Sequence, residues 1–238
     1  MKVSLTIPIY LRGNPNNRAV GLAIKHYSTL GFPLHVCGSE GDISRDYCKP
    51  YLSDTVKYFE VPQASFTKSS GGDDVLRKKF NDSIATHGPG YDWYCLMGAD
   101  DLVSLSFFAG LTDTPEPTMA GIGMDQKLII CDLATGPSNA YTVQLRYRMP
   151  LRLLPGVNAF NAAAMELCNW QPYQRNGCET GAELYFREFG DVVALPGWVL
   201  MVKEGPVLNS TQHVKKRHPT QRINGAELAL IKGFVNKK

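Results

Sequence analysis

The sequence predicts an α/β protein built on an open, twisted, mostly parallel sheet flanked by helices. In residues 3–9, large aliphatic side chains alternate with serine, threonine and proline, which is the period of a strand. Helical spacing follows from Val20 to Leu30, and residues 33–38 form a second apolar run. A strand, helix and strand of these lengths are typical of a parallel crossover. The pattern then repeats along the first half of the chain.

The remaining elements are predicted from the same periods. Residues 56–61 predict a third strand, and Leu76, Phe80 and Ile84 form the apolar seam of the next helix. Residues 91–97 predict a buried fourth strand. The second half predicts short strands at 119–124, 128–132, 141–148 and 198–202, with helices at 162–167, after Glu179 and around 230–234. These strands predict a smaller, mixed sheet, and residues 155–161 are interpreted as a loop.

Composition narrows the class of protein. Hydrophobic residues make up 44% of the 238 positions, enough for the core of a soluble globular domain. No apolar run reaches the roughly 18 residues of a membrane span, and the first residues lack the features of a signal peptide. Six scattered cysteines without C-x-x-C spacing indicate reduced core thiols and a cytoplasmic location. The net charge of +3 does not by itself indicate a nucleic-acid partner.

An acidic tip, Gly98-Ala99-Asp100-Asp101, follows the predicted fourth strand directly. Open α/β sheets bind ligands at the carboxyl ends of their strands. Adjacent carboxylates are ligands that suit Mg²⁺ or Mn²⁺, and these ions bind phosphate oxygens. The tip therefore predicts a site for a metal and a nucleotide.

The order of motifs resembles the GT-A glycosyltransferases, above all their family-2-like group. The motifs are Ile7-Pro8-Ile9-Tyr10, Gly38-Ser39-Glu40-Gly41-Asp42, Lys79-Phe80-Asn81, the acidic tip and Glu179. The resemblance implies a single GT-A-type domain with a nucleotide-binding half at 1–101 and an acceptor half, lid and tail at 102–238. It implies that a sugar is transferred from a nucleotide-sugar to an acceptor hydroxyl. The expected donor is a UDP-sugar, and the expected cofactor is Mn²⁺ or Mg²⁺.

The resemblance also implies roles for particular residues. Those assigned to the nucleotide-sugar are Pro8, Tyr10, Arg12, Glu40, Asp42, Lys79, Asn81 and Lys203. Tyr10 is expected to stack on the base, and Lys79 to reach a phosphate as a point charge. Glu40 or Asp42 is expected to accept hydrogen bonds from uracil or ribose.

The resemblance also implies the residues that bind the metal and the residue that acts as general base. The implied metal ligands are Asp100, Asp101 and His213, with His218 as a substitute for the histidine. One departure from the family pattern is Gly98, which stands where the first carboxylate of the tip is expected. Glu179 is the expected general base for the acceptor hydroxyl. Glu183 is interpreted as structural, because Arg187 lies four residues later for a surface ion pair.

Each candidate also fits an ordinary structural role, such as an exposed helix lysine for Lys79 or a helix-terminal acid for Glu179. Three other functions stay open at this point. The basic segment 215–217 and the absence of an anchor suggest a phage-type enzyme that glycosylates a hydroxymethylated base in DNA. A nucleotidyltransferase also combines an α/β sheet with acidic metal ligands. Gly98 suggests an inactive nucleotide-binding relative.

Overall fold

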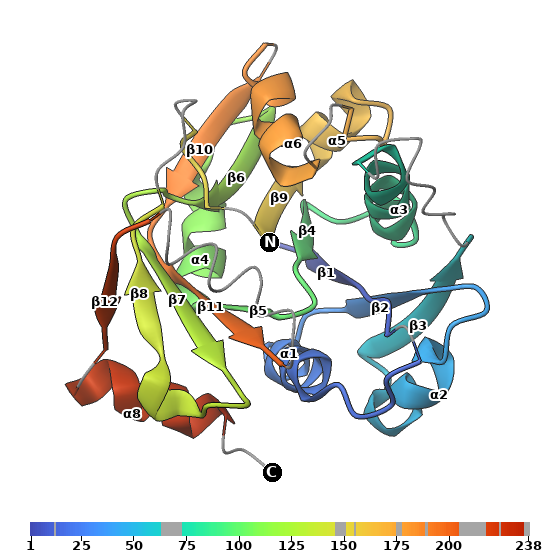
Figure 1. Ribbon diagram of the computed structural model, residues 1–238. Coiled ribbons are helices and arrows are strands. Elements are labelled where there is room, and N and C mark those ends of the chain that lie inside the picture. Colours follow the sequence, from blue (N-terminus) through green and yellow to red (C-terminus); the bar gives the residue numbers. More distant parts are fainter. Residues whose placement is uncertain are drawn as a thin grey trace.

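The main sheet runs through the centre of the molecule (Figure 1). The computed structural model describes residues 1–11, 13–62, 73–145, 151–154, 156–174, 178–188, 190–204, 218–223 and 225–235. Within these residues the sheet has seven strands, in the order β10-β6-β9-β4-β1-β2-β3. They are β1 (Val3–Pro8), β2 (Leu34–Ser39), β3 (Val56–Val61), β4 (Trp93–Met97), β6 (Thr118–Ile122), β9 (Val157–Asn161) and β10 (Asp191–Leu195). Only β9 runs antiparallel to its neighbours in this sheet.

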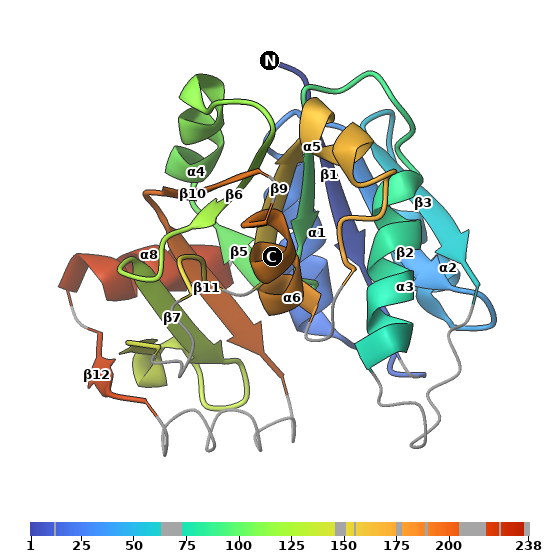
Figure 2. The ribbon, with the colours of Figure 1, turned by 90° about the horizontal axis from the view of Figure 1, so that it is seen from above.

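Helices cover both faces of the main sheet (Figure 2). On one face lie α3 (Asp73–Ala85), α5 (Ala162–Leu167) and α6 (Cys178–Phe186), and on the other lie α1 (Arg18–Ser28) and α2 (Ser44–Cys48). The alternation of β1 explains this arrangement, since Leu5 and Ile7 pack toward α1 while Ser4 and Thr6 face the opposite way. Asn17 caps α1, accepting the N–H of Val20 at 3.1 Å, as the loop before this helix predicts.

A second sheet continues the core on the α1 side. Its order is β12-β8-β7-β11-β5, and its strands are β5 (Asp101–Val103), β7 (Lys127–Asp132), β8 (Tyr141–Val143), β11 (Trp198–Lys203) and β12 (Thr220–Arg222). Ile231 and Val235 of α8 (Gly225–Val235) belong to the same apolar cluster as β7 and β11. The predicted architecture, an open and mostly parallel sheet flanked by helices with a smaller mixed sheet, is confirmed.

The largest difference from the sequence prediction is β9, where a loop was expected. This strand lies between β4 and β6 with every residue buried. Its two asparagines interrupt the apolar pattern typical of a buried strand, and both form hydrogen bonds with residues distant in the sequence. Asn158 donates to the Tyr173 hydroxyl at 3.1 Å, and Asn161 accepts the N–H of Thr118 at 3.1 Å. The strands β5 and β10 and the helices α2 and α4 (Leu105–Gly110) were not predicted either.

Two histidines stack under α3 in the core. The rings of His35 and His87 lie 3.5 Å apart between centroids and 12° from parallel, and the Thr6 hydroxyl hydrogen-bonds to His87 Nε2. Burial lowers the pKa of His35 to about 4. Burial, together with the neighbouring His35, lowers the pKa of His87 to about 2. Both imidazoles are therefore neutral in the folded protein at pH 7.

We expect the free energy of unfolding to fall as the pH drops from about 6.5 toward 4. Above the ordinary histidine pKa of about 6.5, both rings are neutral in both states, and stability is unaffected. Below it the unfolded chain binds protons that the folded chain excludes, which costs up to about 2.7 kcal/mol per pH unit for two histidines. Urea unfolding at pH 7.5 and 5.5 measures this, and His87→Phe should flatten the pH dependence. An equal slope in both proteins would contradict the account.

Candidate functional site

The carboxyl ends of β1, β2 and β4 meet at one edge of the main sheet. Pro8 at the end of β1 pairs with Cys37 of β2, and Thr6 pairs with Leu96 of β4. The loops after these three strands therefore lie side by side, and they carry the motifs singled out in the sequence. Pro8 itself is half-buried at this edge.

Lys79 joins the first two of these loops. Its side chain reaches from α3 into the sheet edge, where only 7% of the residue is exposed. The Nζ atom donates to the backbone oxygen of Ile9 at 2.8 Å and to Ser39 Oγ at 2.9 Å, and it lies 5.3 Å from the centre of the Tyr10 ring. Burial lowers the pKa of Lys79 to about 8, which leaves the ammonium charged at pH 7. Lys79 is thus a buried cation at the edge, whereas Lys78 beside it is exposed.

Asp42 holds the loop after β1 from the other side. Its carboxylate accepts the backbone N–H of Leu11 at 2.9 Å and the hydroxyl of Ser44. Partial burial alone would raise the pKa of Asp42, but these hydrogen bonds, with others from backbone N–H groups nearby, lower it below its ordinary value. Asp42 is therefore an ionised clamp on the loop. The neighbouring Glu40 is exposed at the same edge.

The amide of Asn81 is engaged by the segment before α6. Its Nδ2 donates to the backbone oxygen of Tyr173 at 3.1 Å, and its Oδ1 accepts the Tyr173 N–H at 2.9 Å. This pair of bonds ties α3 to the chain at 171–174. The nucleotide contact expected of Asn81 stays a prediction.

The acidic tip is the joint between the two sheets. The chain leaves the main sheet at Met97 and enters the second sheet at Asp101, whose side chain is buried. A Cβ atom on Gly98 or Gly156 would lie 2.0 or 2.1 Å from Asp101 Oδ2, so the carboxylate packs against the backbone of both glycines. The Tyr27 hydroxyl of α1 also donates to the Asp101 backbone oxygen at 2.7 Å. Asp101 therefore faces the interior of the joint.

Asp100 points the other way and meets Lys203. The Asp100 side chain is 35% exposed, and its carboxylate forms an ion pair with Lys203 Nζ, from the end of β11. The backbone oxygen of Asp100 accepts the N–H of Val202 at 2.7 Å. The end of β11 thus holds Asp100 through both its backbone and its charge.

The described residues of the tip do not fit a divalent ion held by two carboxylates. Asp100 is paired with Lys203, Asp101 is buried against two glycines, and Gly98 has no carboxylate. In the described part of the chain, no group of three His, Cys, Asp or Glu side chains is placed to hold a metal. His213 and Arg12 lie outside the described residues, and His218 is half-buried before β12. The expected Mn²⁺ or Mg²⁺ at this tip stays a prediction.

The two acids of α6 differ in what the structure describes. Glu179 is the second residue of this helix, and its side chain lies outside the described part. Glu183 is 2% exposed, accepts the N–H groups of Arg152 and Leu153 at 2.7 and 3.2 Å, and pairs with Arg187. The structural role predicted for Glu183 is confirmed, but its ion pair is partly buried, since the Arg187 side chain is 26% exposed and that of Glu183 only 2%.

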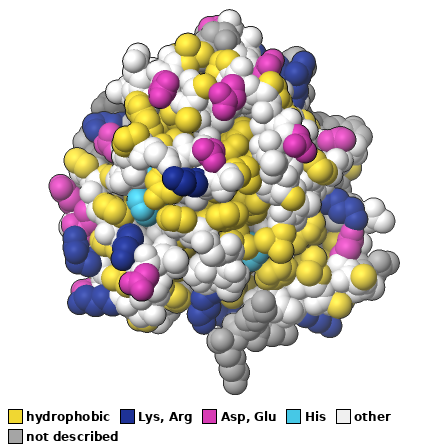
Figure 3. All heavy atoms as spheres, turned by 180° about the vertical axis from the view of Figure 1, so that it is seen from behind, with side chains coloured by type: hydrophobic (Ala, Val, Ile, Leu, Met, Phe, Trp, Pro, Cys, Tyr) yellow, Lys and Arg dark blue, Asp and Glu magenta, His cyan; other side chains and the backbone are white. Residues whose placement is uncertain are grey.

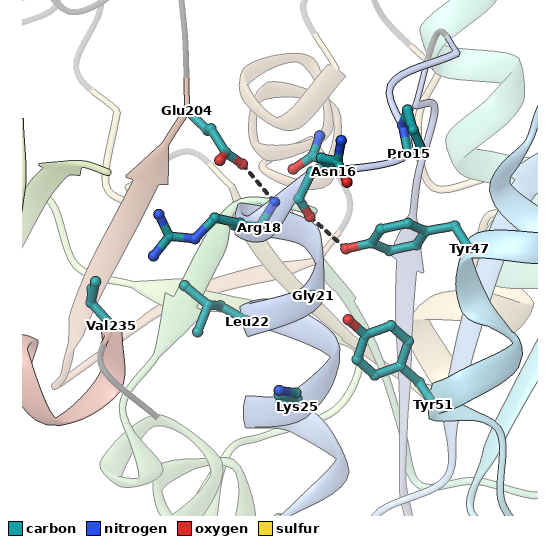
Figure 4. Close-up of a pocket in the computed structure, with 11 residues that line it drawn as sticks. Pro15, Asn16, Arg18, Gly21, Leu22, Lys25, Tyr47, Tyr51, Glu204 and Val235 are labelled. Atoms are coloured by element: carbon teal, nitrogen blue, oxygen red, sulfur yellow. Dashed lines mark hydrogen bonds between the residues drawn. The ribbon is translucent and has the colours of Figure 1, made fainter. Parts of the chain in front are cut away.

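Sequence reasoning missed a pocket of about 830 Å³ beside α1 (Figure 4). Tyr47 and Tyr51 form one wall, and Glu204 accepts the N–H of Arg18 at 2.5 Å on the other. Gly21 leaves the room, because a Cβ there would lie 2.7 Å from the Tyr51 hydroxyl. Glu204 follows Lys203 directly, so the pocket begins next to the tip. The short helix that carries Tyr47 has no apolar period that could have revealed it.

No protein-family model matches this sequence, and no curated protein matches it. Among solved structures, the chain is similar to TarS of S. aureus in complex with UDP-GlcNAc (12% identity over 88% of this chain and 61% of that chain, TM-score 0.48). It is similar to the inositol-1-phosphate CTP transferase of T. maritima (12%, 100% and 96%, TM-score 0.48). A third is a glycosyltransferase involved in the glycosylation of the major capsid of PBCV-1 (11%, 100% and 100%, TM-score 0.44). With TM-scores below 0.5, these likenesses carry no weight on substrate or activity.

We expect Gly98→Ala to destabilise the fold by about 1–3 kcal/mol, the usual cost of overpacking a filled core. The new methyl group would overlap the buried Asp101 carboxylate, which cannot move without opening the joint. Gly233→Ala in α8 is the matched control, because a Cβ there meets no atom within 4 Å. That change should stabilise by up to about 1 kcal/mol through helix propensity. Equal melting temperatures for Gly98→Ala and the wild type would show that the joint is not tightly packed.

Proposed function

We propose that this chain is a glycosyltransferase that takes a sugar from a UDP-sugar and passes it to an acceptor hydroxyl. The observation that supports this most is the convergence of Tyr10, Lys79 and Asp42 on the loop after β1, next to the Asp100–Lys203 pair after β4. An aromatic ring, a clamped loop and charged groups along one sheet edge suit a nucleoside diphosphate. The resemblance found in the sequence points to the same class.

The loop after β1 is the proposed seat of the base. Lys79 fixes it at the Ile9 carbonyl, and Asp42 fixes it at the Leu11 N–H, so its backbone groups are in place before the nucleotide arrives. Tyr10 between them is half-buried and offers a ring for stacking. The exposed Glu40 carboxylate is the proposed acceptor for uracil N–H or ribose hydroxyl groups.

The tip and α6 are the proposed seat of the reaction. The bond between sugar C1 and the diphosphate oxygen breaks, and its electron pair stays on the leaving UDP. The acceptor oxygen forms the new bond to C1, and its proton passes to a base, for which Glu179 on α6 is the candidate. Lys203 forms an ion pair with Asp100 at the tip, and it is the proposed group that stabilises the charge that grows on the leaving group.

One alternative function is distinguished from the proposed one by its product. A nucleotidyltransferase would release pyrophosphate from a nucleoside triphosphate, whereas the proposed reaction releases UDP.

The basic segment 215–217, which suggested DNA as acceptor, lies outside the described residues. Among the described residues on the face seen in Figure 3, acidic and basic side chains are interspersed around apolar ones and form no basic stripe for a nucleic-acid backbone. None of the helices in the described part of the chain has the length and apolar character that crossing a bilayer requires.

We expect UDP to raise the melting temperature, and Tyr10→Ala to weaken UDP binding about tenfold. Loss of one base–aromatic stack costs about 1–3 kcal/mol, while Tyr10→Phe keeps the ring and should retain the stack. Thermal-shift and calorimetric titrations with UDP, GDP and CDP, each with Mn²⁺ and with EDTA, measure this. Hydrolysis of UDP-sugars then tests the donor bond. If no nucleotide binds under either condition, the proposed function fails.

A further inference from the structure

We propose that Lys203 supplies the positive charge that faces the donor diphosphate, so that donor binding in this chain does not require a divalent cation. This inference rests on the proposed function. It starts from the ion pair between Lys203 Nζ and Asp100, at the place where the sequence predicts a metal. It assigns to the lysine the electrostatic task that the resemblance gives to Mn²⁺ or Mg²⁺.

The accessible charges at the tip, those of Asp100 and Lys203, balance each other. A divalent ion between two carboxylates has no net charge, and neither does one ammonium beside one carboxylate. Gly98 removes one of the two expected carboxylates, and Lys203 supplies one positive charge in place of two. The loss of an acid and the presence of a monovalent cation therefore match each other.

Asp101 cannot restore the missing carboxylate. Its side chain is 3% exposed and packs against Gly98 and Gly156, and its backbone pairs with Met201 of β11. Turning the carboxylate outward would empty the space between the two glycines. Of the two acids in the tip, only Asp100 is open to a ligand.

The position of Lys203 is built into the second sheet. Lys203 is the last residue of β11, its backbone oxygen accepts the N–H of Leu133 at 2.8 Å, and Val202 before it donates to Asp100. Its side chain is 16% exposed, which leaves the ammonium partly accessible at the tip. An ammonium has three N–H donors, so pairing with Asp100 is compatible with binding phosphate oxygens. Lys79 is less suited, because it already donates to Ile9 and Ser39.

Calorimetry with UDP and with uridine tests the inference. We expect wild-type UDP affinity in EDTA to stay within about threefold of its value in Mn²⁺. Lys203→Met should weaken UDP binding in EDTA by about 10- to 100-fold, the worth of about 1.5–3 kcal/mol for hydrogen bonds to a charged group. Uridine has no phosphate, so its affinity should be equal in both proteins, which shows that the variant is folded. Lys203→Arg keeps the charge and should retain most of the affinity.

Lys127→Met is the matched control. It removes another lysine–carboxylate pair at a strand of the same sheet, with Glu227, and should leave UDP binding unchanged. UDP binding that appears only with Mn²⁺ and survives Lys203→Met would overturn the inference and leave the proposed function standing. Absence of UDP binding with and without Mn²⁺ would instead overturn the proposed function, and the inference with it.

Discussion

The packing of the Asp101 carboxylate against Gly98 and Gly156 is the constraint on which the rest of the site depends. Within four residues the chain leaves one sheet and enters another, and the side chain of Asp101 packs inside this turn. Tyr27 from α1 holds the same point through the Asp101 carbonyl. Because the joint is anchored on three sides, β5 has one position relative to β11. The place where Asp100 meets Lys203 follows from that position.

The joint also couples packing to charge. A residue with a Cβ at position 98 would collide with Asp101, so the position that would carry the first acid of the tip is reserved for glycine. The fold thereby limits the anionic charge available at the edge of the sheet. At the loop after β1 both signs of charge are present, since the buried Lys79 and the ionised Asp42 hold this loop from opposite sides. Packing and electrostatics at this edge cannot be chosen independently.

The periodicity of apolar residues predicted those strands and helices whose pattern is visible in the local sequence. The strand at 56–61 and the helix at 162–167 have the predicted bounds. The strand β9 was missed because Asn158 and Asn161 depend on Tyr173 and Thr118, which are distant in sequence. Likewise, three adjacent basic residues precede Phe80, and only the tertiary structure shows that Lys79 is buried while Lys78 is exposed. Motif order predicted a candidate site at this edge of the sheet, but only the pairing of strands in the second sheet shows which acid of the tip is open.

The insertion of β9 between β4 and β6 affects how the sheet can form while the protein is being synthesised. β4 ends at Met97, yet its second neighbour starts at Val157, and β6 gains its outer partner only with β10 at Asp191. During synthesis, which proceeds from the amino terminus, one edge of β4 stays unpaired until some sixty further residues have left the ribosome. Open strand edges recruit other strands. The open edge of β4, the central strand of this sheet, is thus available for wrong pairing on the nascent chain until β9 has been made.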